Sequence, residues 1–260
     1  MNRFYQNLLA VLIFINGASV CYSQDNSPVQ LGADLMSRYI WRGVNLGGNS
    51  PSIQPSLKLN LATKDNFHAL TIGAWGAFSV SELSFQEADL YLTYTFKEMI
   101  GLTVTDYYFP SDVTSARNNY FNYDAATTGH VFEGAINFNG TVKIPFTFMF
   151  AMNFYGADKR RVNEDGTSGN IFFSKYAELG YKNSIKGVDL NAFIGAALDN
   201  PDETNGEEGY YYNSSAGIIN LGVKACKKIP ITDKFQLPLQ ASLIFNPEAG
   251  NIFIVFGISL

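Results

Sequence analysis

The sequence is poor in charge and in long apolar runs, and each shortage disfavours a class of protein. Only 16% of the 260 residues are charged, whereas soluble domains average about 25%. The net charge of −5 provides no basic surface for phosphates, so we expect no nucleic-acid partner. Beyond the N-terminal leader, no segment reaches the roughly 18 consecutive apolar residues that suggest a transmembrane helix.

Histidine and cysteine are also scarce, with two of each. They are too few and too scattered for a zinc site. A serine hydrolase needs a histidine base beside its nucleophile, but His68 and His130 lie far apart and no G-x-S-x-G occurs. We therefore expect no enzymatic activity, no metal and no cofactor, and we rank an outer-membrane lipid hydrolase as the least favoured alternative.

Residues 1–23 are predicted to be a signal peptide. Arg3 precedes the apolar run 8–15, and small residues fit cleavage after Ser23. The alternative, lipidation of Cys21, is disfavoured by Val20 directly before it. If Cys21 leaves with the leader, Cys226 stands alone and no intramolecular disulfide can form.

Alternation of apolar with small or polar residues runs through the rest of the chain. The final segment reads N-I-F-I-V-F-G-I-S-L, which places Ile252, Ile254 and Phe256 on one face of a strand. Such blocks of about ten residues, separated by turn residues, are typical of transmembrane barrels. We predict twelve strands, at 29–42, 52–62, 67–79, 85–96, 99–109, 128–138, 141–155, 172–182, 187–198, 214–226, 236–246 and 251–260.

The connections between these strands sort by length. Every connection of fifteen or more residues falls at one end, as expected for outer loops opposite short periplasmic turns. Asn139-Gly140 predicts a two-residue hairpin turn. The fold class is therefore all-β: residues 24–260 form a single antiparallel up-and-down β-barrel in the bacterial outer membrane, in contact with its lipid and with both termini in the periplasm.

Aromatic residues concentrate near the predicted strand ends, where amphipathic rings favour the headgroup level. The predicted outer girdle consists of Tyr39, Trp41, Tyr108, Phe109, Phe154 and Tyr155. In the predicted outer loops, residues 118–123 and 210–212 are also rich in aromatic side chains. They support a rival interpretation, in which the barrel is structural or adhesive and acts through its outer loops.

The predicted inward faces carry charges of both signs. The lumen-lining candidates are Asp34, Arg38, Arg42, Lys58, Glu87, Asp89, Glu133, Lys143, Glu178, Asp189 and Lys224. Such charges can set ion selectivity or bind a small-molecule solute. They can also pair across strands and fill the lumen, which is the interpretation we favour. Asp106 and Lys175 share faces with apolar residues, and interface placement accounts for them.

The segment D-L-M-S-R-Y-I-W-R-G, residues 34–43, resembles the opening strand of the TorF-type porin, or conserved hypothetical Gcw, family. T-D-Y-Y-F, residues 105–109, resembles a second feature of that family. The resemblance implies an outer-membrane barrel with a role in transport and no catalytic residues. It marks Asp34, Arg38, Arg42 and Asp106 as family-typical positions. Together with the alternation, it predicts a porin-like barrel for passive passage of small solutes.

Overall fold

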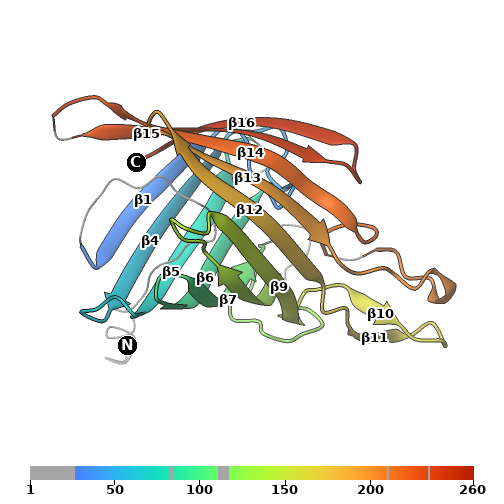
Figure 1. Ribbon diagram of the computed structural model, residues 1–260. Helices are drawn as coiled ribbons and strands as arrows, with labels where there is room; N and C mark the ends of the chain where they lie inside the picture. The colour runs from blue at the N-terminus through green and yellow to red at the C-terminus, as the bar shows by residue number, and fades with distance from the viewer. Residues whose placement is uncertain (1–26, 82–84, 111–116, 210, 234) are drawn as a thin grey trace.

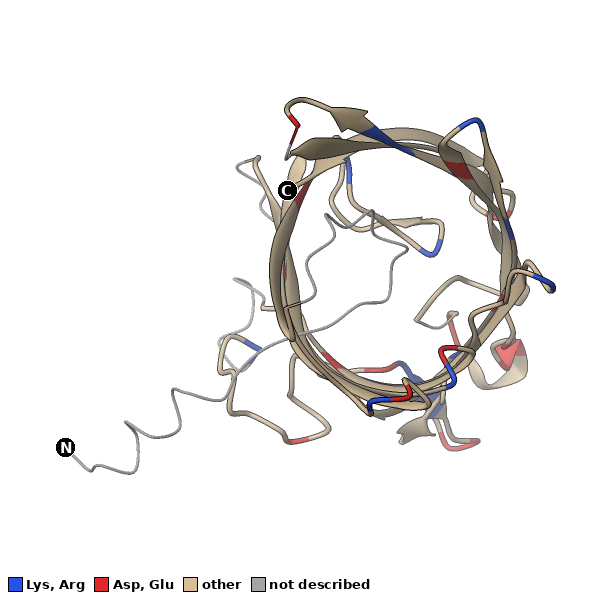
Figure 2. Cartoon of the chain, turned by 60° about the vertical axis from the view of Figure 1, so that its left-hand side comes forward, with Lys and Arg blue, Asp and Glu red and all other residues tan. Residues whose placement is uncertain are grey.

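The computed structural model describes residues 27–260 apart from 82–84, 111–116, 210 and 234. Twelve antiparallel strands, each paired with the next barrel strand along the chain, close into a barrel (Figures 1 and 2). The barrel strands are β1 (Val29–Met36), β4 (Ser52–Ala62), β5 (His68–Ser79), β6 (Gln86–Phe96), β7 (Ile100–Tyr108), β8 (His130–Phe138), β9 (Phe146–Gly156), β12 (Lys175–Ile185), β13 (Val188–Ala197), β14 (Gly217–Pro230), β15 (Gln236–Asn246) and β16 (Asn251–Ser259). The predicted fold class and strand number are confirmed.

The barrel is closed by pairing of β16 with β1. Leu35 lies opposite Ile258, and the backbone groups of Ala33 and Leu260 exchange two hydrogen bonds. Closure gives the first and last strands a neighbour on both sides. In an apolar surrounding every backbone N–H and C=O group needs such a partner, because no water is present.

The predicted alternation is visible in the exposure of each strand. In β16, Ile252, Ile254 and Phe256 are more than half exposed on the outer wall, whereas Phe253 and Val255 are buried inside. The same contrast holds in β7, where Leu102 and Val104 are exposed and Thr105 is buried. The outer wall is therefore an apolar belt around a mostly polar interior.

The long connections gather at one end of the barrel, which we call the outer end. It carries the connections 37–51, 80–85, 109–129, 157–174, 198–216 and 247–250, and the opposite end carries 63–67, 97–99, 139–145, 186–187 and 231–235. Two of the long connections contain small hairpins, β2 (Ile40–Trp41) with β3 (Val44–Asn45) and β10 (Arg160–Val162) with β11 (Ser168–Ile171). A 3₁₀ turn, η1 (Glu203–Asn205), lies in the connection 198–216. The described residues contain no helix that could span a membrane.

Two predicted strands are wrong at one end. The first strand ends at Met36 rather than at 42, because the chain turns back into the barrel there. The seventh begins at Phe146 rather than at 141, since Pro145 has no N–H to donate to the ladder. The connection before it spans 139–145, so the predicted two-residue turn at Asn139-Gly140 is also wrong.

The predicted isolation of Cys226 stays a prediction. Cys226 lies on β14 and is buried. The prediction assumed that Cys21, the other cysteine of the sequence, leaves with the leader. Cys21 and the predicted signal peptide at 1–23 lie outside the described residues.

Candidate functional site in the lumen

The hairpin formed by residues 40–45, here the lumen hairpin, lies inside the outer half of the barrel. Ile40 pairs with Asn45 and Trp41 with Val44, so the turn consists of Arg42 and Gly43. Both turn residues have positive φ, 49° and 78°, which is the conformation of a tight type I′ hairpin. Residues predicted to continue the first strand therefore occupy the lumen instead.

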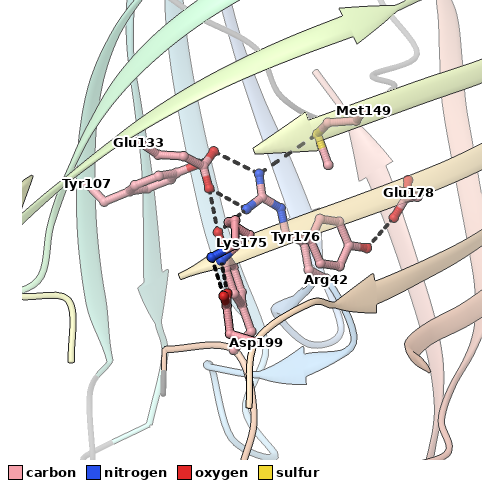
Figure 3. Close-up of polar contacts among 9 residues, drawn as sticks. Arg42, Tyr107, Glu133, Met149, Lys175, Tyr176, Glu178 and Asp199 are labelled. Atoms are coloured by element: carbon pink, nitrogen blue, oxygen red, sulfur yellow. Dashed lines mark hydrogen bonds and ion pairs between the residues drawn. The ribbon is translucent and has the colours of Figure 1, made fainter. Parts of the chain in front are cut away.

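The turn residue Arg42 holds the lumen hairpin to the opposite wall (Figure 3). Its guanidinium forms a bidentate ion pair with Glu133 of β8, with the second contact, Nη2 to Oε1, at 2.9 Å. Glu133 is only 2% exposed and also accepts from the Tyr107 and Tyr212 hydroxyls, at 3.1 and 2.7 Å. A planar guanidinium and a carboxylate with these extra donors make a well-satisfied buried pair.

Aromatic rings enclose the Arg42 guanidinium. Its Cζ lies 4.6 Å from the Trp41 ring centroid and 4.8 Å from that of Tyr176, distances typical of cation–π contacts. Trp41 also stacks on Tyr212, with centroids 5.4 Å apart, and meets Tyr107 edge-on at 5.6 Å. The predictions that Trp41 belongs to an outer girdle and that Tyr212 belongs to an exposed loop patch are wrong, because both rings pack inside the barrel.

Gly43 fits the lumen hairpin tightly against β14. A Cβ at this position would lie 1.8 Å from the Ile219 carbonyl oxygen, so a larger residue cannot occupy the turn without displacing it. The Asn246 amide of β15 donates to the Gly43 carbonyl at 3.2 Å. The lumen hairpin is therefore held at both β8 and β14–β15, across the barrel interior.

A second polar group lies on the inner face of β6, near its outer end. Glu87 and Asp89, here the carboxylate pair, are two residues apart on the same face and are 1% and 6% exposed. Glu87 is within hydrogen-bonding reach of Asp89 and of the Tyr39 hydroxyl. Tyr39, predicted to face lipid, is buried against Trp75 of β5, with centroids 5.4 Å apart. The carboxylate pair and the ion pair of Arg42 thus lie at the same end of the lumen.

The structure distributes the remaining lumen-lining candidates over the inner wall and the rims. Lys58 is buried on the inner face of β4, and Asp34 of β1 interacts electrostatically with Lys224 of β14. Glu178 of β12 accepts from Tyr176 at 2.5 Å and from Asn220 at 2.8 Å. Asp189 has inward parity but is exposed at the rim opposite the outer end.

Three candidates, Arg38, Arg42 and Lys143, do not lie on barrel strands. Arg38 lies in the connection between β1 and β2, and Lys143 lies in the exposed turn before Pro145. Arg38 and Lys143 were predicted to face inward because the predicted strands 29–42 and 141–155 extend beyond the observed β1 and β9. Arg42, in contrast, does reach the lumen, although from the lumen hairpin rather than from β1.

The two charged residues with outward parity, Asp106 and Lys175, each have a side-chain partner. Asp106 of β7 pairs with His130 of β8, Oδ1 to Nδ1 2.7 Å, and the other ring nitrogen of His130 is 2.7 Å from the Tyr120 carbonyl oxygen. Tyr123 stacks on this histidine, so the connection 109–129 covers it on the outer wall. Lys175 forms an ion pair with Asp199 at the outer rim (Figure 3).

An outer-loop carboxylate, Glu207, fastens two connections to each other. It accepts from the backbone N–H groups of Val162 and Asp202, at 3.0 and 2.6 Å, and from Arg161 at 3.1 Å. Burial pushes the pKa of Glu207 upward, but these donors hold it below its ordinary value. The hairpin β10–β11 and the turn η1 are thereby joined into one ordered outer surface.

The polar groups described in the lumen are mainly carboxylates that lie beside aromatic rings. Among the described residues, no group of three or more His, Cys, Asp or Glu side chains is placed to hold a metal ion. His68 lies near the end opposite the outer end, where its ring contacts the Tyr94 hydroxyl at 2.6 Å, and His130 lies on the outer wall. The buried carboxylates and aromatic rings instead suit the binding of cations.

Comparison with known proteins gives a family and one solved fold. The beta domain of the Bordetella autotransporter BrkA, a crystal structure, is 9% identical, with a TM-score of 0.43 over 90% of this chain and 98% of that one. A search of the curated proteins finds no match. Residues 23–218 match the model of a family described as bacterial protein of unknown function, Gcw_chp. Since this match spans most of the sequence, the chain belongs to the Gcw_chp family.

Proposed function

We propose that the protein is an outer-membrane barrel through which small solutes pass passively, by a polar lumen narrowed at its outer end by the lumen hairpin. The apolar outer belt supports the membrane location, since closed barrels satisfy their backbone groups without water. The sorting of long connections to one end supports the orientation. The inward-folded hairpin held by Arg42 is the observation that carries the proposal.

The lumen hairpin restricts a passage without being part of the barrel wall. Its strands have two residues each and pair only with one another, so it is attached to the wall by side chains and by the Asn246 contact. Detaching it breaks no pairing between barrel strands. The proposal assigns no enzymatic step, since neither histidine lies beside a candidate nucleophile in the lumen.

Planar-bilayer recording of the purified protein tests this function. We expect small, discrete current steps from the wild type and larger steps when residues 39–46 are replaced by a short Gly-Ser linker. Arg161→Ala is the matched control, because it removes an arginine ion pair, with Glu207, from the outer loops rather than from the lumen hairpin. Absence of steps in every variant would contradict passage.

The ordered outer end supports a second candidate, adhesion through the outer loops. Phe121 is 82% exposed there, and β10–β11 projects beyond the barrel wall (Figure 1). Deletion of residues 160–171 distinguishes the two candidates. Loss of partner binding with unchanged conductance supports adhesion. Unchanged partner binding with altered conductance supports passage.

A further inference from the structure

The carboxylate pair has no countercharge in the structure. Oε2 of Glu87 and Oδ1 of Asp89 have no hydrogen-bond partner, and no Lys, Arg or His of the described chain forms an ion pair with either residue. The carboxylates of Glu87, Asp106 and Glu133 lie close enough to Asp89 to repel its charge. Two buried neighbouring carboxylates cannot both stay ionised unless a cation joins them; otherwise they share a proton.

An unpartnered hydroxyl at the same place is an independent observation. Tyr91 lies two residues beyond Asp89 on the same face of β6; it is buried, and its hydroxyl has no hydrogen-bond partner. The hydroxyl is close enough to Asp89 to interact with its charge. Buried polar groups are nearly always paired, so one free oxygen on each carboxylate and the free Tyr91 hydroxyl, in one row along β6, point to a binding site.

The remaining walls of this site are aromatic. Trp75 lies directly opposite Asp89 in the register of β5 and β6, and Tyr39 packs on Trp75 and reaches Glu87. Aromatic faces next to carboxylates favour organic cations, which gain from both contacts. Ca²⁺ takes about 6–8 oxygen ligands, more than two carboxylates provide.

The Arg42 site shows how this lumen binds such a cation. There a guanidinium lies between the carboxylate of Glu133 and the rings of Trp41 and Tyr176. The carboxylate pair has the same components, acidic oxygens with tyrosine and tryptophan rings. At the first site the protein itself supplies the cation.

We propose that the carboxylate pair is a binding site for a small organic cation that carries an ammonium or guanidinium group. The proposal rests on the proposed function in one respect, since it makes cationic solutes the class that passes through the lumen. Tyr39, which precedes the lumen hairpin, lies over Glu87. The cation therefore reaches the site when the lumen hairpin moves away from the wall.

Tryptophan fluorescence measures this binding without any conductance. The sequence has two tryptophans, so Trp41→Phe leaves Trp75 as the reporter beside Asp89. We expect n-propylammonium chloride to change its emission saturably in detergent-solubilised protein, whereas sodium chloride at equal ionic strength does not. Glu87→Gln and Asp89→Asn should each weaken binding about tenfold or more, the loss expected for a charge-assisted contact.

Glu178→Gln is the matched control, because it removes a lumen carboxylate that already has partners, and it should bind as the parent does. No saturable change, or equal weakening by Glu178→Gln, would overturn the site. So would an identical response to sodium. Current steps without propylammonium binding would overturn the cation site alone, whereas binding without current steps would support the site and contradict passage.

Discussion

Arg42→Met is predicted to release the lumen hairpin while the barrel stays folded. The substitution keeps an unbranched side chain but removes the guanidinium that bridges to Glu133. Glu133 is then left buried without its cation. Because β2 and β3 pair only with each other, the lumen hairpin can leave the wall without opening any pairing between barrel strands.

The size of the effect follows from the contacts. Breaking a buried ion pair from one side costs about 3–5 kcal/mol. The Tyr107 and Tyr212 hydroxyls still donate to Glu133 after the change, which favours the lower limit. A cost of about 3 kcal/mol corresponds to roughly a hundredfold change in an equilibrium constant. We expect this change in the equilibrium constant for local opening of the lumen hairpin, rather than in that for unfolding of the barrel.

Hydrogen exchange of the refolded protein measures this opening. Amides of residues 40–45 should exchange about a hundredfold faster in Arg42→Met, while β14 and β15 keep their protection. Glu133→Gln should also raise the exchange rate. The double variant should change the opening free energy by less than the sum of the two single changes, because neither charge is then left without its partner. Unchanged protection of residues 40–45 in Arg42→Met would refute the role of the ion pair.

Three further predictions concern other contacts. His130→Gln removes the imidazole partner of Asp106 and should make residues 117–129 protease-sensitive at a cost of about 1–3 kcal/mol; an unchanged cleavage pattern would contradict this. Gly43→Val cannot fit against the wall and should enlarge current steps, whereas Gly48→Asn, at a position with open space, should not; equal steps would argue against the tight fit. The pKa of Glu207 is lowered by folding, so its contribution is present above the ordinary pKa of glutamate and is lost as pH falls through the folded value. Glu207→Gln should remove this acid-dependent loosening of the outer loops in limited proteolysis, and an identical pH profile would exclude the carboxylate.

The barrel wall was predictable because its physics is local. Alternation in β16 and β4 requires only that one face meets lipid and the other the lumen, so a slip of one residue would reverse every side chain. The length of each connection is likewise visible in the sequence. These two regularities determine strand number and orientation without knowledge of any contact.

The lumen hairpin was not predictable in the same way. Tyr39 and Trp41 continue the alternation of β1, so their rings fit an outer girdle equally well. The Arg42-Gly43 pair is a weak turn signal, since arginine rarely adopts positive φ. Only contacts with distant residues such as Glu133 and Ile219 stabilise the hairpin inside, and sequence spacing cannot reveal them. The family-typical segment 34–43 is thus one strand and one inward hairpin.

The central claim, a cation-accepting passage narrowed by the lumen hairpin, is tested most directly by single-channel current. The recording compares the wild type with the variant in which residues 39–46 are replaced, in asymmetric solutions of propylammonium chloride. We predict larger steps in the variant and a reversal potential that shows preference for the cation in both proteins. Steps of equal size with no cation preference, or no steps in either protein, would contradict the account.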